Sequence, residues 1–406
     1  MKKIIERAKS SAVFMWISEL TLGLFIIAIG IFALYGFTIP STVSCFAGEE
    51  IPSYFGASFE AQDSRASVDN VSGVVNVTRG QYKLFGAIPV RSVTLTRLED
   101  VKVYVGGVPF GLKYTTKGAS VAGFEEEAMN PAFRAGLRLH DVITKVNGKT
   151  INGASDIAKA VESGSEIELT YVRAGKEFKL KFKPKYSESE KKYVLGLWLR
   201  DSGAGIGTLT YILPDGSFGG LGHGVCEGET SELVSMSSGN VLGATINGLI
   251  KGQRGAPGEL QGYFNSSNIG EITKNSEVGI FGTLSQIPEV VTSKTYSIGL
   301  KNELKEGKAT ILCTLDDNVR REYSVEIFNI NLNSNGNKCF SVRITDDKLL
   351  AASGGIIQGM SGSPIIQNGK LVGAITHVLI NDPTQGYGIF IENMLSQMAN
   401  DNLQAA

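Results

Sequence analysis

The run Gly-Met-Ser-Gly-Ser-Pro at residues 359–364 constrains the fold of this chain more than any other segment. Glycines on both sides of Ser361 permit a tight turn with positive φ, which a β-carbon would obstruct. An Asn-Gly turn and the apolar stretch 371–375 follow, a pattern typical of a β-hairpin. The sequence therefore predicts a turn that presents the Ser361 hydroxyl, with the backbone N–H groups of Gly359 and Ser361 forming an oxyanion hole.

A nucleophilic serine needs a base, and the chain contains three histidines. His223 is bracketed by glycines in the segment 219–224, where small neighbours let a substrate carbonyl and a serine approach the imidazole. We therefore predict that His223 is the general base. We expect His377 to line the cleft, with the role of base as its alternative, and His140 to lie in a solvated turn of another domain.

The third member of a catalytic triad should be a carboxylate that orients the imidazole. Asp346 and Asp347 lie fifteen and fourteen residues before Ser361, counting 361 − 346 and 361 − 347. Spacing alone does not choose between these two residues and Asp316 or Asp317.

A PDZ-like module precedes this region. Residues 132–137 (Ala-Phe-Arg-Ala-Gly-Leu) lead into the alternating stretch 141–151 with its Asn-Gly turn, then a short helix at 157–161 and two strand-like segments. This order resembles the central part of a PDZ domain. PDZ domains bind a peptide by adding it as a strand and holding its carboxylate on backbone N–H groups. The resemblance places that loop at Phe110, Gly111 and Leu112.

The N-terminus predicts a membrane segment. Basic residues at positions 2, 3, 7 and 9 precede an uncharged run from Leu20 to Ile39, which is long enough to cross a bilayer. Their position predicts that the bulk of the chain is extracytoplasmic. A cleaved signal peptide is the alternative, but the run is longer than the apolar core of such a signal.

Composition limits the kinds of partner, fold and bound group that this chain is expected to have. The net charge of −1 argues against a nucleic-acid partner. The 49 glycines suit a loop-rich β protein, and no metal-ligand spacing or cofactor motif is present. Among the four cysteines, Cys313 and Cys339 are the candidate disulfide pair, and the sequence leaves that bond open.

Several segments closely resemble the SpoIVB-type sporulation signalling peptidases, and the resemblance extends from the membrane segment to the C-terminus. The segments are Thr345-Asp346, 348–350, 354–356, 358–364, 373–378, 381–384 and 386–389. Carried over residue by residue, the resemblance implies a triad of His223, Asp346 and Ser361, in the chain order of chymotrypsin-like peptidases. Asp347 stands where relatives lead us to expect proline.

We therefore expect a mainly β protein, with a PDZ domain followed by a chymotrypsin-like β-barrel serine peptidase domain. The expected parts are 1–40 (cytoplasmic tip and transmembrane signal-anchor), 41–97 (linker and short strands, the linker over about 41–66), 98–184 (PDZ domain) and 185–406 (peptidase domain).

The family likeness also implies a role in endospore formation. The enzyme would pass from the forespore membrane into the space between forespore and mother cell. There it would cleave a regulator of the intramembrane protease that activates a late mother-cell sigma factor. The likeness further implies self-cleavage within about 41–90. The alternative from another class is a non-catalytic PDZ scaffold that binds membrane-protein tails.

Overall fold

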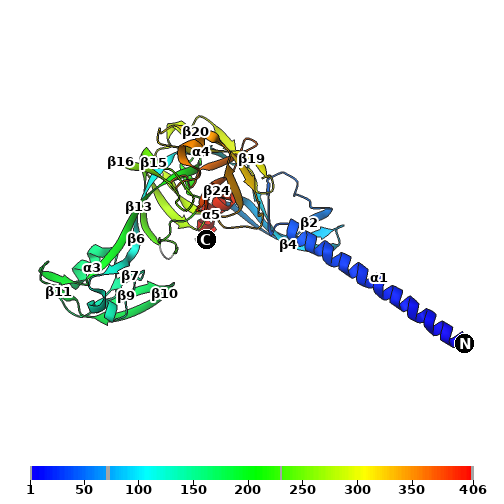
Figure 1. Cartoon of the computed structure of the whole chain (residues 1–406), viewed down its shortest axis with the longest axis horizontal. Coiled ribbons are helices and arrows are strands. Elements are labelled where there is room, and N and C mark those ends of the chain that lie inside the picture. The colour runs from blue at the N-terminus through cyan, green and yellow to red at the C-terminus, as the bar shows by residue number, and fades with distance from the viewer. Residues whose placement is uncertain (1, 70–73, 229–230, 404–406) are drawn as a thin grey trace. The chain divides into compact units, whose positions relative to one another are not determined.

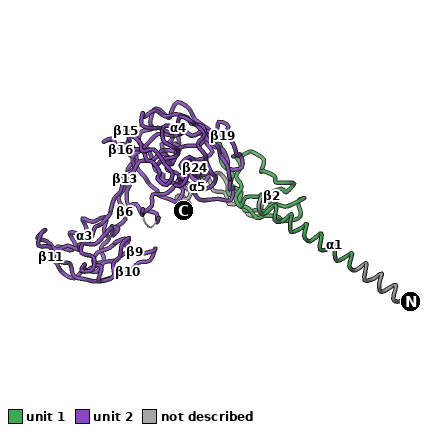
Figure 2. Tube along the Cα trace, viewed as in Figure 1, with its two compact units in different colours: residues 1–101 green, residues 102–406 purple. Residues whose placement is uncertain are grey.

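The computed structural model describes residues 2–69, 74–228 and 231–403. The chain divides into two units, residues 1–101 and 102–406 (Figure 2).

The first unit combines a long helix with a small sheet. Helix α1 (Lys2–Thr38) contains the stretch Met15–Gly36, with a mean hydropathy of 2.3, which is long and apolar enough to cross a membrane. The sheet has the order β1-β4-β3-β2, with β1 parallel to β4 and the other neighbours antiparallel. Its strands are β1 (Thr42–Phe46), β2 (Ala57–Asp69), β3 (Val74–Leu84) and β4 (Ile88–Leu98).

This sheet differs from the linker that we expected over 41–66. Val43, Cys45 and Ala57 are buried together with Tyr82 and Leu95 in one apolar core. In β3 and β4 buried side chains alternate with less buried ones, so these strands bury one face of the sheet, whereas residues 43–46 of β1 are all buried.

The second unit contains two barrels. In the first, β6, β15, β16, β17, β14 and β13 pair in that order, and β6 also pairs with β13, so the path closes on itself. The second is the closed barrel β19-β20-β21-β24-β23-β22. The strands are β5 (Lys102–Val105), β6 (Pro109–Phe124), β13 (Leu197–Ile212), β14 (Ser217–Gly220), β15 (Met236–Ile250), β16 (Glu259–Ser276), β17 (Gly279–Leu284), β18 (Thr295–Ser297), β19 (Gly307–Thr314), β20 (Arg320–Phe328), β21 (Phe340–Ile344), β22 (Pro364–Gln367), β23 (Lys370–Leu379) and β24 (Asp382–Phe390).

A smaller α+β module is inserted between β6 and β13. It comprises η1 (Glu127–Met129), α2 (Pro131–Arg134), β7 (Val142–Val146), β8 (Lys149–Thr150), α3 (Ala154–Val161), β9 (Ile167–Arg173), β10 (Lys176–Phe182), β11 (Lys185–Ser187) and β12 (Lys192–Val194). It has its own buried core, to which the far end of β6 contributes Ala119 and Val121. β6 and β13 run as one paired ribbon between this module and the first barrel (Figure 1).

Strands from both sides of the predicted boundary at residue 185 pair with one another. Strand β5 and the first half of β6 precede the inserted module, yet β5 pairs with β13 and Phe110 lies in the core of the first barrel. Short helices complete the peptidase part: η2 (Glu289–Val291), α4 (Asp347–Ser353) and α5 (Ile391–Leu403).

A substitution of Phe110 tests whether the first half of β6 packs in the core of the first barrel. Its side chain is fully buried and packs edge-on against Phe218, with ring centroids 6.2 Å apart. Phe110→Ala should lower the free energy of unfolding by about 3–5 kcal/mol, because it leaves a cavity in the barrel core. The control Phe178→Ala removes a partly exposed ring from β10 and should cost much less. Urea denaturation followed by circular dichroism compares the two, and equal losses would contradict the burial of Phe110 against Phe218.

Candidate active site

The turn around Ser361 has the backbone that its glycines predict. Gly359 and Gly362 have φ of +95° and +94°, in the region that favours glycine. A β-carbon at Gly362 would come within 2.1 Å of the Thr208 carbonyl oxygen. The close approach of this turn to strand β13 therefore requires glycine at position 362.

Two threonines of β13 hold the turn in place. The Thr208 N–H donates to the Ser361 carbonyl at 3.0 Å, and the Thr208 hydroxyl donates to the Gly359 carbonyl at 2.7 Å. The Thr210 hydroxyl donates to the Gly362 carbonyl at 2.8 Å. Sequence reasoning missed both threonines, although their alternation in Thr-Leu-Thr-Tyr was a signal that they share one face of a strand.

The amide groups predicted for an oxyanion hole remain available. Within the described ranges, neither the Gly359 N–H nor the Ser361 N–H has a hydrogen-bond partner, whereas the Met360 N–H donates to Ile357. Two unpaired donors on either side of one residue are suited to stabilise a developing oxyanion.

Ser361, His223 and His377 line the same cleft, whose volume is about 1080 Å³. His223 follows β14 of the first barrel, whereas Ser361 and His377 belong to the second. The two imidazole rings are adjacent, with centroids 4.9 Å apart. The Ser361 hydroxyl donates to the Thr376 carbonyl at 2.7 Å.

The hydrogen bond of His223 indicates its tautomer. Nδ1 lies 2.9 Å from the Gly224 carbonyl oxygen. Because a carbonyl only accepts, Nδ1 carries the proton and Nε2 keeps its lone pair. This is the tautomer that a general base acting through Nε2 requires.

Burial lowers the pKa of both imidazoles and so favours their neutral forms. Desolvation lowers the pKa of His223 below its ordinary value of 6.5, and the bond to Gly224 opposes this only in part. Desolvation, with help from His223 and Lys338, lowers the pKa of His377 to about 4. Nδ1 of His377 is buried and has no hydrogen-bond partner in the described part of the chain.

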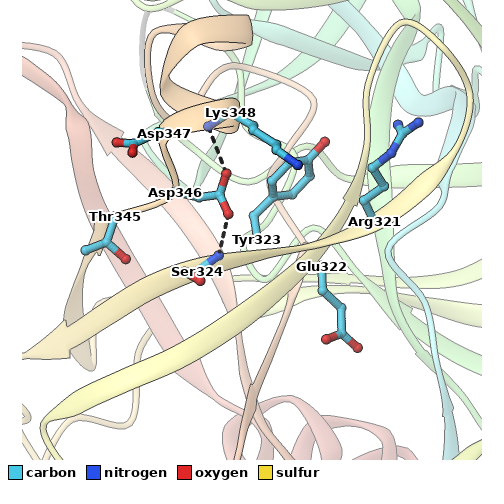
Figure 3. Close-up of a pocket in the computed structure, with 8 residues that line it drawn as sticks. All are labelled: Arg321, Glu322, Tyr323, Ser324, Thr345, Asp346, Asp347 and Lys348. Atoms are coloured by element: carbon cyan, nitrogen blue, oxygen red, sulfur yellow. Dashed lines mark hydrogen bonds between the residues drawn. The ribbon is translucent and has the colours of Figure 1, made fainter.

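Asp346 lies apart from this cleft. One carboxylate oxygen accepts from the Lys348 N–H at 3.0 Å, and the other accepts from the Ser324 N–H at 3.3 Å (Figure 3). The first oxygen also accepts from the Leu349 N–H at 3.1 Å. Asp346 is thus the N-cap of α4, and it borders a separate hollow of about 430 Å³. Asp347 is the first residue of the helix and is exposed.

The structure joins Ser361 to His223 in one cleft and places Asp346 at a helix terminus. An aspartate directly before a helix is a common N-cap pattern, so the sequence contained a signal for this role. Glu232 and Glu277 are the carboxylates that line the cleft among the described residues.

The residues expected in the PDZ peptide loop lie in the first barrel. Phe110 and Leu112 are buried in its core, and a β-carbon on Gly111 would lie 2.4 Å from the Phe264 ring. Their strand pairs with β13 on one side and β15 on the other. Because the neighbouring strands occupy both edges, this segment has no open edge for a peptide carboxylate.

The expected pair Cys313 and Cys339 is not bonded; both thiols are free and buried. The Cys339 thiol donates to the Gly336 carbonyl at 3.2 Å, and burial raises the pKa of both thiols. Within the described ranges, no group of three or more His, Cys, Asp or Glu side chains is placed to hold a metal ion.

Comparison with known families identifies the chain. The model of the SpoIVB peptidase S55 family matches residues 191–395. The chain belongs to this family. It is therefore a serine protease, and a PDZ domain model matches residues 110–183. The chain matches no functionally curated protein significantly.

Several solved structures resemble parts of this chain. The PDZ domain of an SdrC-like protein from Listeria monocytogenes is 19% identical and covers 21% of this chain and 90% of its own, with a TM-score of 0.19. An inactive variant of Rv3671c from M. tuberculosis is 15% identical over 50% of this chain and 83% of its own, with a TM-score of 0.28. The HtrA-type protease AlgW with a decapeptide is 8% identical and covers 74% of this chain and 65% of its own, with a TM-score of 0.30.

The lowered pKa of His223 predicts the pH dependence of catalysis. A general base must be unprotonated, so kcat/KM should rise with pH through the pKa of His223 in the free enzyme. Because desolvation lowers that pKa, the midpoint of the rise should lie below 6.5. Hydrolysis of a peptide substrate from pH 4 to 9 measures it. A midpoint above 6.5 would indicate a carboxylate beside His223 in the working enzyme.

Substitution of Asp346 separates its two possible roles. Asparagine caps helices about as well as aspartate but carries no charge. If Asp346 acts only as a cap, Asp346→Asn should keep kcat within about threefold, whereas Asp346→Ala should lose about 1 kcal/mol of stability. A loss of several hundredfold in kcat for Asp346→Asn, with unchanged thermal stability, would instead show that its charge supports His223.

Proposed function

We propose that this serine protease is a membrane-anchored, extracytoplasmic endopeptidase in which Ser361 is the nucleophile and His223 is the general base. The observation that carries the proposal is their convergence from different barrels on one cleft. Helix α1 is the proposed anchor.

The proposed reaction begins with rotation of the Ser361 hydroxyl from the Thr376 carbonyl toward Nε2 of His223. The hydroxyl attacks the scissile carbonyl as His223 takes its proton, which it later returns to the leaving amine. The Gly359 and Ser361 N–H groups receive the oxyanion, and losing one such donor costs about 3 kcal/mol. Asp346 remains the triad carboxylate implied by the family likeness, and that role would require it to leave the α4 cap.

The biological setting is proposed from the family likeness. The enzyme acts in signalling between compartments during endospore formation, after it crosses the forespore membrane. Its protein substrate is a regulator of an intramembrane protease, whose release activates a late mother-cell sigma factor. The position of α1 before the folded units supports delivery across that membrane.

Self-cleavage within about 41–90 completes the proposal. In this range, β1, β2, β3 and β4 are paired in a sheet, whereas residues 47–50 form an exposed stretch after β1. A peptidase needs an accessible segment that can open into an extended form in its cleft, which paired strands do not offer. We therefore place the cut in the exposed turn 47–50, where it would break the covalent link between α1 and the catalytic unit while β1 stays paired with β4.

Incubation of the purified protein in detergent tests the proposal. Mass spectrometry should find a new N-terminus near 47–50 in the wild type and none in Ser361→Ala. Ser363→Ala is the matched control: its hydroxyl is fully buried and has no hydrogen-bond partner among the described residues, so its removal should leave cleavage unchanged.

A fluorophosphonate probe provides a second readout that needs no substrate. It should label the wild type and Ser363→Ala at Ser361 and leave Ser361→Ala unlabelled. Absence of both trimming and labelling in the wild type would favour the non-catalytic scaffold.

A further inference from the structure

The edge of the PDZ module beside helix α3 is filled by a strand of the same chain. β6 pairs with β7 through Ala119 and Ser120, and on its other side with residues 197–202 of β13, antiparallel. PDZ domains take peptides by strand addition at such an edge. Here the added strand is covalently part of the protein.

The side chains of this segment alternate as those of a bound peptide would. Leu197 and Leu199 pack against the apolar core of the module. Trp198, between them, points outward and is 62% exposed. This period of two is expected when one face of a strand is buried and the other is solvated.

The segment also contacts α3. The Asp201 carboxylate accepts from the Ala154 N–H at 2.8 Å, at the first residue of the helix. A β-carbon on the preceding residue, Gly153, would lie 2.6 Å from the same carboxylate oxygen. The strand is therefore held by β6 on one side and by the start of α3 on the other.

The same strand continues into the catalytic cleft. Ile206 lines the cleft, and Thr208 and Thr210 hold the turn that carries Ser361. Thr208 lies six positions after Ser202, the end of the segment in the PDZ module, on the same strand (208 − 202). No loop intervenes between them, so a displacement at one end passes along a single paired strand.

We propose that residues 197–202 are an internal ligand of the PDZ module, and that their seating at its edge supports the catalytic turn through β13. The PDZ edge is closed to outside peptides while this segment is in place. A partner that binds there must present an extended apolar peptide and displace the chain's own strand. The catalytic part of this inference rests on the proposed function; the occupancy of the edge does not.

The test uses two substitutions on adjacent residues of the full chain in detergent. Leu199→Asp puts a charge into the module core and should release the segment, whereas Trp198→Asp alters the exposed face. Hydrogen exchange should rise at least tenfold in residues 115–124 and in the turn 359–362 for Leu199→Asp only. Fluorophosphonate labelling of Ser361 should slow at least tenfold in that variant alone.

Each alternative result has its own meaning. Unchanged exchange of 115–124 in Leu199→Asp would overturn the internal ligand. Raised exchange there with unchanged labelling and an unchanged 359–362 turn would overturn the coupling. If the wild type is never labelled, the proposed function fails, but the exchange of 115–124 still decides the occupancy.

A second variant and a synthetic peptide complete the experiment. Should Leu199→Asp not fold, Asp201→Ala removes only the bond to Ala154 and should raise exchange at 115–124 by a smaller factor. A synthetic peptide with the sequence of residues 196–202 is the binding probe. It should restore protection of 115–124 in Leu199→Asp and leave the wild type unaffected; binding to the wild type edge would contradict internal occupancy.

Discussion

The antiparallel pairing of β6 with β13 joins the functional parts of the second unit. At one end the two strands share the core of the PDZ module, and at the other they close the first barrel. Every backbone group in such a ladder needs a partner, because an unpaired buried N–H or C=O costs free energy comparable to a lost hydrogen bond. The pairing therefore fixes the register of β13, and with it the position of Thr208 against the catalytic turn.

The cleft combines apolar walls with few charges near its reacting groups. Leu112 and Ile206, from the paired strands, contribute to its lining together with the two imidazoles. Neutral imidazoles cost less to bury than charged ones, which explains why both His223 and His377 have lowered pKa values. A neutral His377 beside His223 leaves the Nε2 lone pair of His223 ready to accept a proton at neutral pH.

Insertion of the PDZ module into the first barrel changes how the two domains can communicate. When domains follow one another, a single linker joins them. Here two strands cross between module and barrel, and they pair with each other on both sides of an irregularity at residues 116–119 of β6. A paired ribbon resists bending and sliding more than a flexible linker, so the module and the catalytic turn are mechanically connected.

The sequence alone determined the local features of this protein. It predicted the glycine-bracketed turn at Ser361, the apolar N-terminal helix, the PDZ module and the β character of the peptidase part, since each depends on neighbouring residues. Tertiary structure decided which strand pairs with which, because any strand edge accepts many partners. It therefore determined that Phe110 belongs to the barrel, that residues 41–66 enter a sheet and that the cysteines stay apart. It also placed Asp346 on the backbone amides of α4 and Ser324, since a carboxylate binds whichever donors the fold brings within reach.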